Sequence, residues 1–187
     1  SAMQLKGLAS FAARNVTRLI RACSRGVRGG RILFTVFRVI HFGQEIMVHG
    51  TVSLSGPGWT LSSTGPRRVS VPAVVPNDIS DDLQTAGLLP DLWYGNNSMF
   101  AEHWVLNQSW TLARGFALPP YTRGAHVWLA FDGVDYNCTV SLNGKRIGAH
   151  IGAFEPFELM ATGALHPAGE PNLLEVVLHA PFPWLVA

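Results

Sequence analysis

The sequence predicts an all-β fold, a sandwich of antiparallel strands with one short helix, and three observations support this prediction. Apolar and polar side chains alternate along several short stretches, which is the period of a strand with one buried face. Turn-forming residues separate these stretches, since the chain has 19 Gly and 12 Pro in 187 residues. Finally, 48% of the residues are hydrophobic and only 14% are charged. This composition fits one domain with a substantial core better than a disordered chain.

Residues 1–48 differ from the rest of the chain and are predicted to form a basic amphipathic leader. Eight of the 14 Lys and Arg lie in residues 1–38, where no acidic residue occurs. On a helix, five arginines would form one stripe opposite a stripe of apolar side chains. An Arg-rich amphipathic segment is typical of an organelle transit peptide, or of a helix that contacts an anionic membrane. An unstructured extension, or sequence that is removed from the mature protein, is the alternative.

The apolar segment at residues 32–40, ILFTVFRVI, has two interpretations within this leader. It is too short to cross a bilayer, which takes ~20 residues. Basic residues precede it, as they precede the core of a signal peptide. An edge strand explains the same residues equally well.

Residues 50–181 are predicted to form the sandwich itself. Alternation begins near Val52, and a short β-branched run over residues 69–75 is interrupted by Pro72, which favours an edge strand. One helix is expected over residues 78–86, with Asn77 or Asp78 as its N-cap and Gly87 beyond its end. The strand pattern then continues through two tryptophans, Trp104 and Trp110, and Trp110 is expected in the core.

A hairpin over residues 136–147 is the most clearly predicted element. Tyr136, Cys138, Val140 and Leu142 alternate with polar residues, so Cys138 is expected to be a small core residue. Asn143-Gly144 follows directly, and both residue types tolerate the positive φ of a two-residue hairpin turn. The return strand begins at Lys145 and is expected to break at Gly148 and Gly152.

Three stretches resemble motifs of a known family, and they occur in the order that the family has. They are SLSGPGWTLSS (53–63), VPAVVPNDISDDLQTAGLLPDLWYGNN (71–97) and FDGVDYNCTVSLNGKRIGAHIGAFEPFEL (131–159). Together they resemble the amino-terminal sugar-binding domain of glycoside hydrolase family 2, and the second resembles its β-mannosidase branch in particular. The resemblance implies a jelly-roll β-sandwich of the galactose-binding type.

The same resemblance implies a function for the loop PDLWYGNN at residues 90–97. In β-mannosidases the similar loop lies beside the mouth of the active site. Aromatic rings stack on the CH faces of sugars, and amides pair with their hydroxyls. Trp93, Tyr94 and Asn97 are therefore the candidate substrate-binding residues. The alternative is that Trp93 and Tyr94 cover an edge of the sandwich.

No catalytic site is predicted in this chain. A retaining glycosidase needs two carboxyl groups about 5–5.5 Å apart, whereas adjacent acids such as Asp81 and Asp82 diverge by about 100° on a helix. The resemblance places the two catalytic Glu on a separate (β/α)₈ barrel, which is absent here. The chain is thus expected to be inactive alone, to support that barrel and to contribute a loop to the sugar pocket. A free-standing carbohydrate-binding module and a non-enzymatic interaction fragment remain as alternatives.

No cofactor or metal site is expected either, because the seven His form no ligand motif, and His150 is expected to be a hydrogen-bonded structural residue. Nucleic acid is not an expected partner, since residues 39–187 carry six basic and 12 acidic side chains. Four glycosylation sequons favour a secretory route to the lysosome or vacuole, whereas the leader favours an organelle. The sequons begin at Asn15, Asn96, Asn107 and Asn137.

Overall fold

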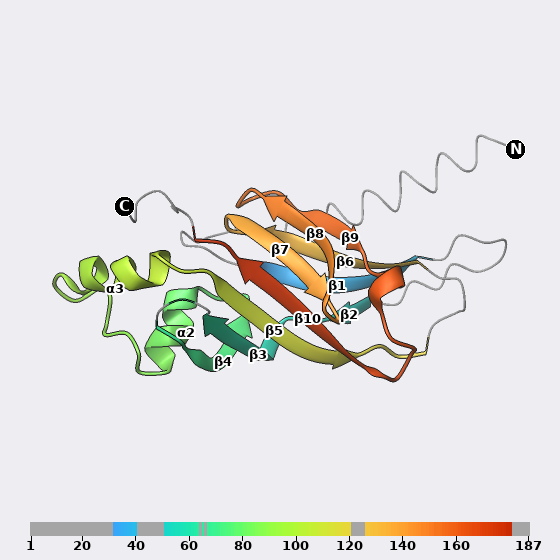
Figure 1. The fold of residues 1–187 in the computed structure, drawn as a ribbon, viewed down its shortest axis with the longest axis horizontal. Helices are drawn as coiled ribbons and strands as arrows, with labels where there is room; N and C mark the ends of the chain where they lie inside the picture. The colour runs from blue at the N-terminus through green and yellow to red at the C-terminus, as the bar shows by residue number, and fades with distance from the viewer. Residues whose placement is uncertain (1–31, 41–50, 64, 66, 121–125, 181–187) are drawn as a thin grey trace, which may run out of the picture.

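Two antiparallel sheets make up the fold in the computed structural model, which describes residues 32–40, 51–63, 65, 67–120 and 126–180 (Figure 1). One sheet has four strands in the order β2-β1-β6-β9, and the other has six in the order β4-β3-β5-β10-β7-β8. The prediction of an all-β sandwich is confirmed. The strands are β1 (Ile32–Ile40), β2 (Thr51–Ser53), β3 (Gly56–Ser63), β4 (Ser70–Val75), β5 (Trp110–Ala117), β6 (His126–Val134), β7 (Asn137–Leu142), β8 (Lys145–Ile151), β9 (Phe157–Met160) and β10 (Pro171–Leu178).

The core lies between the sheets because each central strand buries every second side chain. Strand β6 alternates in this way, and β7 and β10 do the same from the other sheet. Trp110 is 2% exposed, so its predicted place in the core is confirmed. Fully buried side chains of the core include Trp59, Leu61, Val127, Leu129, Phe131, Cys138, Val140, Leu142, Leu174 and Val176.

The predicted hairpin between β7 and β8 is confirmed, with Asn143 at φ 52° and Gly144 at φ 75°. The Asn143 side chain also anchors the turn, because it donates to the Ala164 carbonyl at 2.8 Å and accepts from the Leu173 amide at 2.8 Å. The expected break at Gly148 is wrong. Strand β8 continues through Gly148, and the sheet absorbs the irregularity as a register shift opposite Val140 and Ser141.

Strand β4 lies at an edge of its sheet, as Pro72 predicts. Strand β1 lies between β2 and β6, so residues 32–40 are a strand but not an edge strand. These residues come from the segment assigned to the leader. The remainder of that segment, including the basic stripe, lies outside the described residues.

Helix α2 (Ile79–Thr85) confirms the predicted short helix. The Asp78 carboxylate caps it by accepting from the Ser80 amide at 2.7 Å, and Gly87 follows at φ 72°. Asp82 turns inward from this helix. Its Oδ1 accepts from the Val74 amide at 3.3 Å and from Asn77 Nδ2 at 2.8 Å, and so ties the helix to β4.

A second helix, α3 (Asn97–Leu106), corrects the prediction of a single helix, and a short 3₁₀ turn, η1 (Thr162–Ala164), follows β9. Trp104 therefore lies on a helix rather than on a strand. Its ring contacts Trp110 with centroids 5.9 Å apart, and Trp110 Nε1 donates to the Val105 carbonyl at 2.8 Å. None of the described helices has the length and hydropathy needed to span a membrane.

Candidate functional site

The candidate loop, residues 90–97, joins α2 to α3 at one end of the sandwich (Figure 1). Leu92 is partly buried against the hydrophobic core and anchors the loop. The next two side chains point into solvent, since Trp93 is 96% exposed and Tyr94 is 76% exposed. Side chains this exposed do not cover an edge of the described sandwich, so that alternative is not supported.

Asp91 organises the backbone of this loop. Its carboxylate accepts from the Trp93 amide at 3.0 Å, and its carbonyl accepts from the Tyr94 amide at 3.2 Å. The same carbonyl accepts from Asn97 Nδ2 at 2.8 Å. Gly95 takes φ 58° to complete the turn. The two aromatic rings are thus presented by a hydrogen-bonded turn.

The predicted residues have different positions in this arrangement. Trp93 and Tyr94 have free faces for a planar or apolar partner. The amide nitrogen of Asn97 is used inside the loop, where it fixes the start of α3. Met99, on the first turn of α3, is 64% exposed and adds apolar surface beside the loop. Sequence reasoning missed Met99 because it expected no helix after residue 97.

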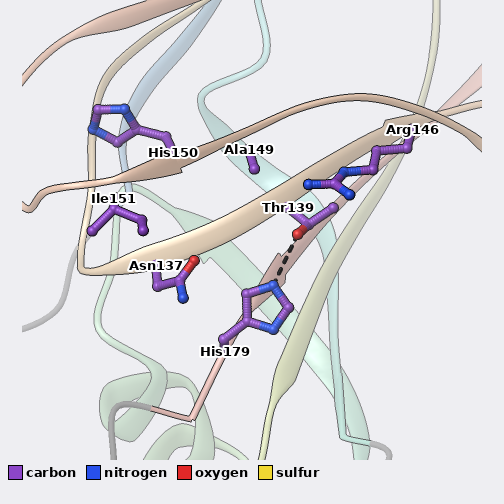
Figure 2. Close-up of a pocket in the computed structure, with 7 residues that line it drawn as sticks. All are labelled: Asn137, Thr139, Arg146, Ala149, His150, Ile151 and His179. Atoms are coloured by element: carbon purple, nitrogen blue, oxygen red, sulfur yellow. Dashed lines mark hydrogen bonds between the residues drawn. The ribbon is translucent and has the colours of Figure 1, made fainter.

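A second feature lies on the outer face of the six-stranded sheet, where an open hollow of about 630 Å³ is found (Figure 2). The His179 amide donates to the Asn137 carbonyl at 2.9 Å, and the His179 imidazole Nε2 lies 2.9 Å from Thr139 Oγ1. The hollow is lined by Asn137, Thr139, Arg146, Ala149, His150, Ile151 and His179. The predictions did not include Arg146 or His179.

The environment of His150 differs from the expected hydrogen-bonded one. Its ring stacks on Phe157, with centroids 4.0 Å apart and planes 11° apart. Its Nε2 is buried, and no hydrogen-bond partner is found for it in the described structure. Ring packing, rather than a hydrogen bond at Nε2, holds this imidazole.

Among the described residues, three carboxyl groups have raised pKa values. Burial raises the pKa of Asp132 and of Asp135, and the charge of Asp78 adds to the effect at Asp135. For Asp82, burial raises the pKa most, while its hydrogen bonds from Asn77 and Val74 oppose the shift. Asp82 is occupied in tying α2 to β4, which gives it a structural role.

The three predicted glycosylation residues that the structure describes occupy different surroundings. Asn96 and Asn107 flank α3 and are both exposed. Asn137 begins β7, is half-buried and lines the hollow. Asn15 lies outside the described residues.

Comparisons with known proteins agree with this fold. Residues 59–184 match the family model described as the glycosyl hydrolase 2 galactose-binding domain-like family. The chain is 38% identical over 94 residues to β-mannosidase B of Thermothelomyces thermophilus, covering 50% of the chain and 11% of that protein. It is 32% identical over 114 residues to β-mannosidase A of Emericella nidulans, covering 61% of the chain and 12% of that protein.

Among solved structures, the β-D-mannosidase from Dictyoglomus thermophilum is similar with a TM-score of 0.59 and 28% identity. The match covers 68% of this chain and 15% of the solved one. The chain therefore spans between about a tenth and a seventh of the length of these three relatives. The family match covers most of the chain, from within β3 through β10, so the chain belongs to the glycosyl hydrolase 2 galactose-binding domain-like family.

Proposed function

We propose that this chain acts as the non-catalytic amino-terminal domain of a β-mannosidase-like glycoside hydrolase. This parent enzyme hydrolyses terminal β-mannosides. Family membership supports the domain assignment. The curated relatives of which the chain spans 11% and 12% are named β-mannosidases, which supports the choice of parent enzyme. The domain supports the catalytic barrel and contributes the loop of residues 90–97 to the sugar pocket.

The observation that carries the role of the loop is the exposure of Trp93, at 96%, on a turn held by hydrogen bonds to Asp91. Leaving a large ring in water stabilises nothing in the free domain, whereas burying it against a partner gains roughly 25 cal/mol per Å² of apolar area. A turn that is already hydrogen-bonded also loses less entropy when it binds.

Each candidate residue then has a role. The indole of Trp93 supplies a flat apolar face for the CH groups of a pyranose, or for the rim of the barrel. Tyr94 supplies a second ring and a hydroxyl that can donate to or accept from a sugar hydroxyl. Asn97 positions the loop through the hydrogen bond that its side-chain amide donates to the Asp91 carbonyl.

The test is kinetic and uses the parent enzyme, identified by reading the transcript beyond the codon for Ala187. Trp93→Ala in that enzyme is expected to lower kcat/KM for an aryl β-mannoside about tenfold or more, the effect of one lost anchor of ~1.4 kcal/mol. Met99→Ala is the matched control, because Met99 is also exposed beside the loop. An unchanged kcat/KM in the Trp93 variant, or an equal loss in both variants, contradicts the proposed role.

A free-standing carbohydrate-binding module is the second candidate, favoured by the same exposed rings. Calorimetry of the 187-residue chain with mannose and manno-oligosaccharides separates the two. Measurable heat at millimolar sugar that disappears in Trp93→Ala favours the module. Absence of heat favours a loop that binds only together with the barrel.

We also propose a secretory route to the lysosome or vacuole. The exposure of Asn96 and Asn107 supports it, since both sequons are accessible on the folded surface. The test is the mass of the protein from its native source before and after treatment with peptide N-glycosidase. An unchanged mass contradicts the proposed route. Import of the protein into an organelle, directed by residues 1–48, would contradict it as well.

A further inference from the structure

The hollow on the outer face of the six-stranded sheet takes part in none of the functions above, and it is formed by three separate segments (Figure 2). Strands β7 and β8 pair so that Asn137 lies opposite Ile151 and Thr139 opposite Ala149. These four side chains share one face of the sheet. His179, just beyond β10, completes the third side, where its backbone amide donates a hydrogen bond to the Asn137 carbonyl.

The chemistry of the lining is uneven in charge. Arg146 provides a permanent positive charge, and none of the seven lining residues is acidic. In Figure 2 the Arg146 guanidinium lies beside Thr139, and the His179 ring lies on the other side of Thr139. A guanidinium binds a carboxylate through two parallel hydrogen bonds, which makes it selective for planar anions.

The remaining lining is amphipathic. Ile151 is 62% exposed beside Asn137, although a β-branched apolar side chain gains nothing from water. The Asn137 amide and the Thr139 hydroxyl lie next to it and can pair with hydroxyl groups. An apolar surface flanked by amide and hydroxyl groups suits the two kinds of surface of a sugar ring. The volume, about 630 Å³, falls in the usual range of small-molecule sites.

We propose that this hollow is a second carbohydrate site, and that it binds a saccharide bearing a carboxylate. Arg146 pairs with the carboxylate, Asn137 and Thr139 bind ring hydroxyls, and Ile151 with Ala149 supports the apolar face of the ring. The site is distinct from the loop that carries Trp93, and its ligand class differs from the neutral mannoside of the proposed function.

His179 has a positioning role in this site. Its Nε2 lies 2.9 Å from Thr139 Oγ1, so the imidazole fixes the rotamer of the hydroxyl that faces the ligand. Asn137 also begins a sequon, and a glycan on it would fill the hollow. Protein for the test is therefore produced in a host that does not attach N-glycans.

The test is a titration of the 187-residue chain, with isoleucine methyl groups labelled for NMR, against sodium glucuronate. Methyl β-mannoside and sodium acetate are the two reference ligands, because one lacks the charge and the other lacks the ring. Glucuronate is expected to shift the Ile151 methyl signal at concentrations at least about tenfold lower than either reference. Equal shifts with acetate would reduce the hollow to a plain anion site, and absence of any shift at Ile151 would also overturn the proposal.

Two variants make the test specific. Arg146→Gln is expected to weaken glucuronate binding about tenfold or more, the effect of losing one charge-assisted pair. Lys145→Gln is the matched control, because it removes the same charge from the adjacent residue, whose Nζ donates to the Gly163 carbonyl at 3.2 Å outside the hollow. An equal loss in both variants would indicate only long-range electrostatics. Trp93→Ala is expected to leave glucuronate binding unchanged. Loss of glucuronate binding in this variant would place the ligand at the loop and overturn the proposal.

Discussion

The imidazole of His150 stacks on the ring of Phe157, with centroids 4.0 Å apart, and thereby joins the edge of the six-stranded sheet to the edge of the four-stranded one. Phe157 in turn stacks on Phe131 at 4.6 Å, so three rings lie in succession between the sheets. The cost of this contact is the buried Nε2 of His150, for which no partner is found in the described structure.

His150→Phe is therefore expected to raise the free energy of unfolding by about 1 kcal/mol. The phenyl ring keeps the stack and removes a buried polar atom that has no partner. Denaturant unfolding monitored by fluorescence measures the change, with His150→Ala as the control that loses the stack and is expected to be destabilised. A less stable Phe variant would mean that the imidazole is hydrogen-bonded in solution.

Gly148→Ala is expected to destabilise the fold by about 1–3 kcal/mol, the usual cost of overpacking a core. A Cβ at position 148 would clash with Leu159 Cδ2 and would lie 2.9 Å from Leu159 Cδ1. Gly163→Ala is the matched control, since a Cβ there would meet nothing closer than Lys145 Nζ at 4.0 Å. Thermal unfolding of the two variants should differ clearly, and equal melting temperatures would show that the Leu159 side chain moves aside at little cost.

Local patterns predicted the hairpin at Asn143-Gly144 and the helix capped by Asp78 because each depends on residues close in sequence. Helix α3 was missed because its sequence lacks the local pattern that marks a helix. Apolar and polar residues are distributed all around it, so it has no stripe with the helical period, and Trp104 was assigned to the strand pattern that continues at Trp110.

The two candidate sites differ in the same way. The aromatic loop is contiguous, so its composition alone marks Trp93 and Tyr94. The hollow combines Asn137 with Ile151 and His179, and their meeting depends on the pairing of β7 with β8 and on the end of β10. The register shift opposite Ser141 places Arg146 on the same face as Thr139. No local pattern in the sequence indicates a register shift of this kind.

Asp82 is expected to make stability fall as pH rises. Burial raises its pKa above 3.8 in the folded protein, so the folded state binds this proton more tightly than the unfolded state. The free energy of unfolding then decreases as pH rises from 3.8 through the raised pKa. Asp82→Asn keeps an oxygen acceptor for Val74 and Asn77 without the charge, and it should flatten this decrease.

The measurement is a series of denaturant midpoints between about pH 4 and pH 7. Asp81→Asn serves as the control, because it removes a charge from the adjacent, exposed position. The Asp81 charge contributes less to the raised pKa of Asp82 than burial does, so this variant is expected to flatten the slope less than Asp82→Asn. If the denaturant midpoint of Asp82→Asn falls with pH as steeply as that of the native protein, Asp82 is not the cause of the decrease. Asp82→Ala is expected to lose about 1–3 kcal/mol at all these pH values, since it leaves the Val74 amide without its acceptor.

Cys138 is expected to resist thiol reagents while the protein is folded. Burial raises the pKa of its thiol from 9.0 to about 11, which reduces the reactive thiolate about a hundredfold at pH 8 even before access is considered. Labelling with iodoacetamide in a Cys23→Ser background, followed by mass spectrometry, measures the rate. Ser141→Cys on the outer face of β7, in a chain also carrying Cys138→Ala, is expected to react rapidly. Fast labelling of native Cys138 would show that the sheets open.

Trp93 and Trp59 make a matched pair that separates contact from folding. Trp59 is 2% exposed, donates from Nε1 to the Leu54 carbonyl at 2.8 Å and lies under the Arg114 guanidinium. Trp59→Ala is therefore expected to lose about 3–5 kcal/mol of folding free energy, as large aromatic truncations in cores do. Trp93→Ala, at 96% exposure, is expected to change it by less than about 0.5 kcal/mol. Denaturant unfolding of both variants measures the difference.

A loss at Trp93 comparable to that at Trp59 would make the exposed indole part of the fold and would remove the main support for its role at a sugar pocket. If instead stability is unchanged, the side chain contributes nothing to the isolated sandwich. Its presence then has to be explained by what the loop contacts, and the kinetic comparison of Trp93→Ala with Met99→Ala becomes a test of binding alone.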